Sequence, residues 1–181
     1  ETETYVALRL EAQNWRWAGV PFFIRAGKAM PTKLTEIRIV LESPPSLGIG
    51  NRATPEADEI IFRIDPKAGA CILMEAKQPG EDALRRVHLD LLFAQQVGEQ
   101  PTPYERLLSD AIHGQPELFS RMDMVEETWR IVQPLIDKPC PIETYAKGSW
   151  GPESATHLLQ GYGGWRKPWM PDDMPYGPVG A

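Results

Sequence analysis

The chain has 181 residues, of which 42% are hydrophobic and 24% are charged, and its formal net charge is −6. This composition is typical of one soluble globular domain, and the acidic balance argues against a nucleic-acid partner, because such binding depends on Lys and Arg neutralising phosphates. No apolar run approaches the roughly 18–20 residues of a membrane span, so we expect no membrane partner either.

The first residues, ETETYVALRLEA, already alternate like a strand, with Val6, Leu8 and Leu10 on one face. Glu1 is not a methionine, and a native protein seldom opens in the middle of a strand. We therefore expect this sequence to be a piece of a longer chain.

Six segments have the alternating, β-branched pattern of strands. They are Thr4–Glu11, Pro21–Arg25, Glu36–Leu41, Glu59–Ile64, Ala70–Glu75 and Val87–Leu91. The links between the later strands, among them KQPGEDALRR, have no helical period, so neighbouring strands are predicted to pair antiparallel.

Helices are predicted only after the strands. Thr102 and Glu105 fit a capping box with Pro103 at the first helical position, which predicts a helix to about Ile112. A second helix is predicted to begin with a cap-like Asp123.

The second helix should end before Pro139, and a short third helix should follow Pro152 through about Leu159. Strands followed by helices indicate the α+β class: a large, mostly antiparallel sheet with helices on one face. We predict one domain over residues 1–165.

Residues 166–181 are predicted to form a Gly/Pro-rich C-terminal tail, since nine of the last 21 residues are Gly or Pro. Four aromatic residues could let the end of the chain dock as an extended arm, and a disordered tail is the alternative. They are Tyr162, Trp165, Trp169 and Tyr176.

A cationic segment stands out from the acidic remainder. Between Arg16 and Arg38 there are five basic residues and one acidic residue, a net charge of +4. Within it, Lys28 and Lys33 lie in a connection that contains Gly27 and Pro31. Two ammonium groups on one phosphate would each make charge-assisted hydrogen bonds of about 1.5–3 kcal/mol. The segment thus predicts a site for a small anion, and ordinary exposed lysines are the alternative.

Other chemistry is not indicated. The sequence has no GxGxxG after a strand, no P-loop and no HExxH, and we predict no metal site. Cys71 and Cys140 could form a disulfide, but we favour two buried free thiols, which fits a reducing, cytoplasmic location.

The lysine segment belongs to a longer resemblance. The chain resembles the C-terminal domain of glucose-6-phosphate dehydrogenases, which carry an N-x-R-W-x-G-V-P-F block followed by R-x-G-K. The matching stretches span about residues 1–165. They are NWRWAGVPFFIRAGKAMPTKLTEIRI, NRATPEADEIIFRIDP, KQPG, LDLLF, PYERLLSDAIHGQPELFSRMDMVEETWRIVQPLI and YAKGSWGP.

The resemblance implies a fold and a reaction. In this family a Rossmann domain precedes a large α+β domain, similar to that of glyceraldehyde-3-phosphate dehydrogenase, whose sheet forms a homodimer interface. The family oxidises glucose 6-phosphate to 6-phosphogluconolactone and reduces NADP. A histidine takes the proton from the sugar C1 hydroxyl, and an aspartate orients that histidine.

The resemblance also assigns roles to residues. Lys28 and Lys33 match family positions that contact the sugar phosphate, and Asp65 sits where many relatives carry a glutamine near the substrate. Arg25 and Arg38 match positions that face a second, structural NADP in animal members.

Three cations of that second site are replaced here, by Leu34, Leu73 and Trp150. We therefore predict that the second site is absent and that Arg25 and Arg38 pair with acidic neighbours instead.

The resemblance places the coenzyme loop, the catalytic His and Asp and a third substrate-binding Lys before Glu1. We therefore expect no catalytic residue in this chain and no activity from it alone, with NADP, or else NAD, bound mainly by the preceding domain. The alternative is a free-standing, non-catalytic assembly or regulatory module of the same fold.

Overall fold

The computed structural model describes residues 2–45, 56–81, 83–98 and 101–170. The chain divides into two compact units. The first contains Glu1–Lys28 and Gln100–Pro152, and the second contains Ala29–Glu99 and Glu153–Ala181.

The first unit begins with an antiparallel hairpin of β1 (Tyr5–Glu11) and β2 (Pro21–Gly27). The side chain of Asn14 shapes its connection, because its Oδ1 accepts hydrogen bonds from the backbone N–H groups of Arg16, at 3.1 Å, and Trp17, at 2.8 Å. Such side-chain-to-backbone bonds are how Asn stabilises turns. Both predicted strands are confirmed.

The helix α2 (Pro103–Ile112) begins as predicted. The backbone N–H of Thr102 donates to Glu105 Oε2 at 2.8 Å, and Thr102 Oγ1 accepts from the backbone N–H of Glu105. The hydrogen bonds from Thr102 also lower the pKa of the Glu105 carboxyl. The capping box is therefore confirmed.

The helix α3 (Met122–Asp137) begins two residues earlier than predicted, and the cap-like role of Asp123 is wrong. Arg121 occupies the N-cap position without a side-chain cap, and its guanidinium binds the Asp123 carboxylate, with Nε–Oδ1 at 3.1 Å. Asp123 instead lies in the first turn, where a negative charge interacts favourably with the positive end of the helix dipole.

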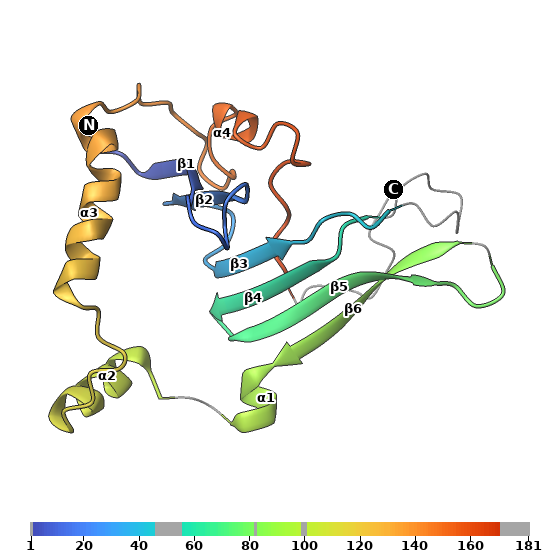
Figure 1. The fold of residues 1–181 in the computed structure, drawn as a ribbon, viewed down its shortest axis with the longest axis horizontal. Coiled ribbons are helices and arrows are strands. Elements are labelled where there is room, and N and C mark those ends of the chain that lie inside the picture. The colour runs from blue at the N-terminus through green and yellow to red at the C-terminus, as the bar shows by residue number, and fades with distance from the viewer. Residues whose placement is uncertain (1, 46–55, 82, 99–100, 171–181) are drawn as a thin grey trace. The chain divides into compact units, whose positions relative to one another are not determined.

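The second unit contains an antiparallel four-stranded sheet in the order β3-β4-β5-β6, whose strands lie side by side in Figure 1. The strands are β3 (Thr35–Val40), β4 (Glu59–Asp65), β5 (Gly69–Lys77) and β6 (Leu84–Leu92). The four predicted strands and their antiparallel pairing are confirmed.

The predictions differ from the structure at two connections. β6 begins at Leu84, because the backbone N–H of Gln78 donates to Ala83 O at 2.9 Å and carries the β5–β6 hairpin into a stretch that we expected to be loop. A short helix, α1 (Phe93–Val97), was not predicted, and α4 (Ser154–His157) is shorter than expected. The α+β class and the mostly antiparallel pairing are confirmed, although the described strands form a two-stranded and a four-stranded sheet.

The four-stranded sheet has one apolar face, because alternate residues of every strand point to the same side. The register pairs Ile37 with Phe62 and Ile72 with Leu89, and these side chains are exposed on this face. We call it the apolar face. Other exposed members include Ile39 and Leu91.

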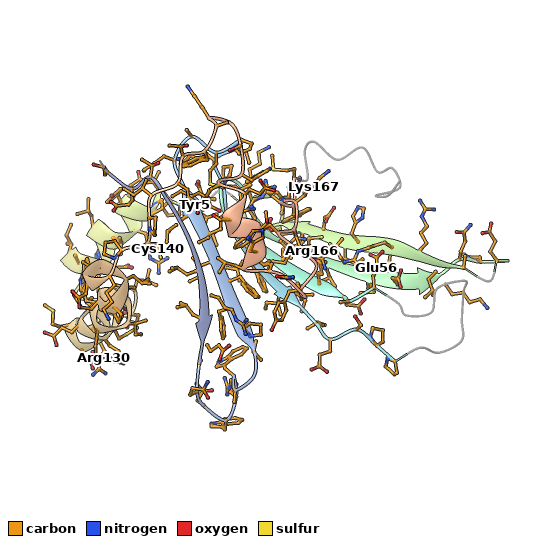
Figure 2. The ribbon with its side chains drawn as sticks, turned by 90° about the horizontal axis from the view of Figure 1, so that it is seen from above. Tyr5, Glu56, Arg130, Cys140, Arg166 and Lys167 are labelled. Atoms are coloured by element: carbon orange, nitrogen blue, oxygen red, sulfur yellow. The ribbon has the colours of Figure 1, made fainter. Side chains whose placement is uncertain are left out.

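The opposite face carries the buried core. Ile61 and Cys71, each 1% exposed, pack there against Trp169, which is 3% exposed. Trp169 belongs to residues 166–170, a segment without regular secondary structure that we call the C-terminal strap. Figure 2 labels its first residues, Arg166 and Lys167, beside this sheet.

Of the two alternatives for the end of the chain, an extended arm describes residues 165–170. Tyr176 and residues 171–181 lie outside the described residues, so the predicted tail beyond Met170 is not tested.

Both cysteines are free, as predicted. Cys71 is buried, but Cys140 is exposed, so its predicted burial is wrong. Cys140 follows the end of α3 in a Pro-rich segment without regular structure.

Candidate functional site

Lys28 follows the last residue of β2, and its backbone is held on both sides. Its N–H donates to Thr4 O at 2.8 Å, and its carbonyl oxygen accepts from the Tyr145 hydroxyl at 2.8 Å. The same hydroxyl is 3.1 Å from Thr4 O. The side chain of Lys28 is exposed, so a fixed backbone presents a solvated ammonium group.

Tyr145 itself is held by aromatic packing. Its ring lies 5.4 Å from that of Tyr5, centroid to centroid, in a tilted arrangement. The Tyr5 hydroxyl is buried without a hydrogen-bond partner among the described residues, and burial raises the pKa of this phenol despite the opposing effect of Arg25. Gly151 makes room for this ring, since a Cβ there would lie 2.3 Å from Tyr5 Cε2.

Lys33 and Asp65 come together at one end of the four-stranded sheet. Asp65 is the last residue of β4 and pairs with Thr35, the first residue of β3, two residues after Lys33. The register shifts between Thr35 and Glu36, which is the mark of a β-bulge. Bulges re-aim the end of a strand and are common beside functional sites.

Two backbone positions beside these residues are strained. Ala29, next to Lys28, has a φ of +51°, and Lys67, two residues after Asp65, has a φ of +49°. Non-glycine residues rarely adopt this left-handed conformation, and such positions concentrate at ligand-binding and active sites. The two strained positions thus lie within two residues of Lys28 and of Asp65.

Arg38 makes ion pairs with two carboxylates of the four-stranded sheet. Its NH1 lies 2.6 Å from Glu59 Oε2 and its NH2 lies 3.0 Å from Glu36 Oε1. The predicted pairing with acidic neighbours is therefore confirmed for Arg38. Its guanidinium is already committed to two carboxylates, which does not fit a second NADP at this position.

Arg25 stacks on an aromatic ring. Its guanidinium carbon is 4.8 Å from the centroid of the Trp150 ring, a cation–π contact. Trp150 is one of the residues that replaces a cation of the animal site, and Leu73, another, is half-buried against the core. These contacts give the replacements a packing role in this chain.

Cys71 is not a reactive thiol. Burial, followed by a hydrogen bond with Asp90, raises the pKa of its thiol from 9.0 to about 12. The thiolate is the nucleophilic form of cysteine, so Cys71 is inert at neutral pH. Among the residues that the structure describes, no three His, Cys, Asp or Glu side chains are grouped to hold a metal ion.

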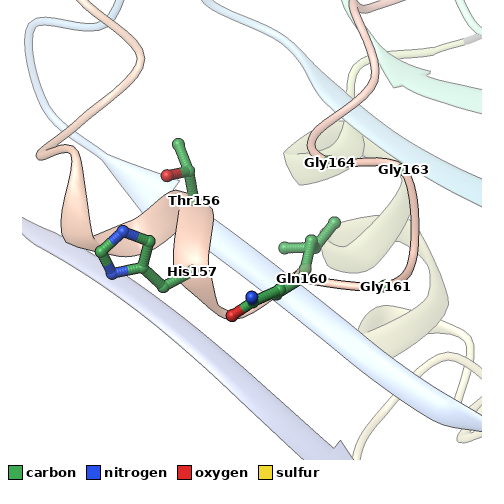
Figure 3. A pocket seen from close by; sticks show the side chains of 7 residues that line it. Thr156, His157, Gln160, Gly161, Gly163 and Gly164 are labelled. Carbon is green, nitrogen blue, oxygen red and sulfur yellow. The ribbon is translucent and has the colours of Figure 1, made fainter.

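A pocket of about 570 Å³ lies elsewhere in the second unit, at the end of α4 (Figure 3). Thr156 and His157 of α4 line it together with the turn that follows the helix, including Gly161 and Gly164. It includes none of the predicted site residues.

Sequence reasoning missed two parts of the site. The hydroxyl of Tyr145 fixes the backbone of Lys28, and its only sequence signal was its place in the YAKGSWGP stretch. Sequence reasoning predicted acidic partners for Arg38 but did not find Glu59 as a shared partner of Arg38 and Arg86, because both arginines are far from Glu59 in sequence.

The comparison with known protein families decides the identity of the fold. The family model described as "Glucose-6-phosphate dehydrogenase, C-terminal domain" matches residues 1–169. The chain belongs to this family.

Relatives of this glucose-6-phosphate dehydrogenase domain are much longer. Glucose-6-phosphate 1-dehydrogenase 1 of Mycobacterium bovis is 52% identical over 171 residues, which are 94% of this chain and 36% of the relative. Glucose-6-phosphate 1-dehydrogenase of Aggregatibacter actinomycetemcomitans is 40% identical over 173 residues, which are 92% of this chain and 35% of the relative. The chain therefore spans about a third of the length of these relatives.

Solved structures agree with the family. The crystal structure of glucose-6-phosphate 1-dehydrogenase from Mycobacterium avium matches with a TM-score of 0.81 and 50% identity, over 94% of this chain and 36% of that one. A second structure, glucose-6-phosphate dehydrogenase in complex with its substrate glucose 6-phosphate, matches with a TM-score of 0.74 and 29% identity, over 91% of this chain and 35% of that one. None of the helices described in this chain has the length and apolar character that a membrane crossing requires.

Proposed function

We propose that this chain is the substrate-binding and dimerisation part of a glucose-6-phosphate dehydrogenase. In the parent enzyme it binds the phosphate of glucose 6-phosphate, which is oxidised to 6-phosphogluconolactone while NADP is reduced. The observation that carries the proposal is the structural match to a dehydrogenase solved with glucose 6-phosphate.

Lys28 and Lys33 are proposed as the phosphate ligands. Five residues of chain span no more than about 18 Å, which is the upper limit for the separation of their Cα atoms. Lys33 is exposed at the start of β3, and its ammonium group can donate to a phosphate oxygen. We assign Asp65 to a sugar hydroxyl, from which its carboxylate can accept a hydrogen bond. This role is compatible with a phosphate bound by the two lysines.

The redox chemistry is proposed to lie outside this sequence. The described strands are antiparallel, and no Gly-rich turn joins a strand to a helix among the described residues in the manner of a dinucleotide site. We therefore assign NADP, with NAD as the alternative, to a preceding domain of a cytoplasmic parent enzyme. This chain supplies affinity and orientation for the sugar phosphate.

A comparison of the parent enzyme with the isolated 181-residue chain tests this function. We expect the parent to reduce NADP when glucose 6-phosphate is added, measured as absorbance of the reduced coenzyme. We expect no reduction by the isolated chain, because the groups that transfer the proton and hydride lie outside it. NADP reduction by the isolated chain, or none by the parent, would contradict the proposal.

Dimerisation through the apolar face of the four-stranded sheet is the second part of the proposal. Large contiguous apolar surfaces on a folded protein mark interaction sites. A second copy of the same chain is the proposed occupant, since stable homodimer interfaces are apolar and bury about 2,000 Å² or more.

A charge placed on this face should prevent the dimer. Leu89, which is 61% exposed, lies on the apolar face next to Ile72. We expect Leu89→Asp to convert the parent enzyme from dimer to monomer at micromolar concentration, measured by light scattering, because a carboxylate cannot be buried unpaired. The conservative variant Leu89→Met should remain a dimer. A dimeric Leu89→Asp variant would refute the proposed interface.

A further inference from the structure

The C-terminal strap is bound to β3, which begins two residues after Lys33, and to β4, which ends at Asp65. Arg38 of β3 donates from NH2 to Lys167 O at 2.7 Å, and the backbone N–H of Trp169 donates to Glu36 Oε2 at 2.8 Å. Arg166 Nε lies 3.5 Å from Glu59 Oε1 of β4. The strap thus crosses the β3–β4 pair by a chain of polar contacts.

Trp169 is the buried residue of the strap. Its ring is 3% exposed against Ile61 and Cys71, and the Arg63 guanidinium carbon is 5.3 Å from the ring centroid. The sheet is shaped to receive the ring, because a Cβ on Gly69 would lie 3.3 Å from Trp169 Cη2 and 2.5 Å from Leu91 O.

Arg63 depends on this packing. The residue is 4% exposed, its NH2 contacts Met170 Sδ at 3.5 Å, and its Nε has no hydrogen-bond partner among the described residues. A buried cation is costly unless other groups stabilise it. The faces of Trp rings attract cations, so the strap supplies much of the environment that keeps Arg63 in place.

The register connects this packing to the site. Glu36 and Arg63, the two residues that hold Trp169, are paired across β3 and β4. The next pair in the ladder is Thr35 with Asp65, beyond the register shift, and Lys33 follows two residues further out. The strap therefore contacts Glu36 and Arg63, the last regular pair of this end of the ladder. Asp65 and Lys33 lie just beyond that pair.

We propose that Trp169 is a positioning residue, which holds the ends of β3 and β4 so that Lys33 meets the sugar phosphate. The inference rests on the proposed function for its substrate. The residue touches no substrate; it acts through Glu36 and Arg63. Loss of the ring leaves a cavity and removes the cation–π contact of the buried Arg63 guanidinium. Both changes fall at the Glu36–Arg63 pair, next to the chain segment that contains Lys33.

The test compares tryptophan variants in the full-length parent enzyme. We expect Trp169→Ala to raise KM for glucose 6-phosphate about tenfold, because small displacements of a binding group are costly. KM for NADP and kcat should stay within about twofold. Trp169→Phe, which keeps an aromatic face for Arg63, should restore KM. Where the alanine variant fails to fold, Trp169→Leu takes its place, with the same expectations.

Trp165→Ala is the matched control, since Trp165 precedes the strap and donates from Nε1 to Ala155 O at 2.9 Å. It removes an indole from the same part of the chain but leaves the strap's bonds to Arg38, Glu36 and Glu59 in place, so KM should be unchanged. In a Lys33→Ala background, Trp169→Ala should add no more than about twofold, since coupled residues are non-additive. Equal effects of both tryptophan variants, or additive effects with Lys33→Ala, would overturn the proposal.

Hydrogen exchange separates this proposal from the proposed function. In the parent protein, Trp169→Ala should speed amide exchange in residues 32–37 and leave Leu84–Leu92 unchanged, whether or not the enzyme oxidises glucose 6-phosphate. Unchanged exchange at residues 32–37 would overturn the positioning role alone. An inactive wild-type parent would overturn the proposed function alone.

Discussion

Replacement of Lys33 with Ala in the parent enzyme should raise KM for glucose 6-phosphate about ten- to hundredfold. The variant loses a charge-assisted hydrogen bond of about 1.5–3 kcal/mol to the phosphate, and each 1.4 kcal/mol is about tenfold in affinity. Because the phosphate is bound equally in the ground state and the transition state, kcat should change little. Steady-state kinetics with each substrate varied in turn measures both constants.

Two further lysine variants make this experiment specific. Lys33→Arg keeps a positive charge two residues before β3 and should retain most of the affinity for glucose 6-phosphate. Lys77, an exposed lysine at the other end of the same sheet, provides a control of equal charge. Lys77→Ala should leave KM unchanged. A rise in KM for NADP as large as that for glucose 6-phosphate would remove Lys33 from the phosphate site.

Neutralising Glu59 should cost the protein about 3–5 kcal/mol of unfolding free energy. Glu59 is 4% exposed and its two oxygens lie 2.6 Å from Arg38 NH1 and 3.1 Å from Arg86 NH2. Glu59→Gln keeps the shape of the side chain but removes the negative charge that compensates these cations. Removing one partner of a buried ion pair has an effect of this size, because the charge of the other partner stays desolvated and uncompensated.

Urea denaturation of the parent protein, followed by circular dichroism, measures the change. Glu11→Gln is the matched control, since Glu11 makes a surface pair with Arg9, at 2.9 Å, and both side chains are at least 43% exposed. Surface pairs of this kind contribute about 0–1 kcal/mol. Equal unfolding midpoints for the two variants would show that the Glu59 pairs contribute no more than a solvated pair.

The strands were predictable because each one obeys a local rule. Alternation alone located β1 to within one residue, and the capping box located the start of α2. The start of α3 was missed because Asp123 satisfies the same local pattern as a cap, while its carboxylate binds Arg121 instead. Local sequence could not show which partner that carboxylate would choose.

The sequence nominated residues for the candidate site, but it did not show the contacts that hold their backbone in place. Charge and glycine placement singled out Lys28 and Lys33, and a long resemblance gave them a ligand. The bonds that hold them in place join residues distant in sequence, such as Glu36 with Trp169, 133 residues apart. Such contacts follow from strand register and the path of the strap, which no local pattern records.

The bond from Tyr145 to Lys28 has a consequence for the order of folding. Its two partners are 117 residues apart, and the same hydroxyl reaches Thr4 across 141 residues. Contacts that close long loops carry a large entropic cost and tend to form late. During synthesis the hairpin of β1 and β2 emerges long before Tyr145 exists. The backbone of Lys28 thus reaches its final geometry only after Tyr145 has been made, late in the synthesis of this domain.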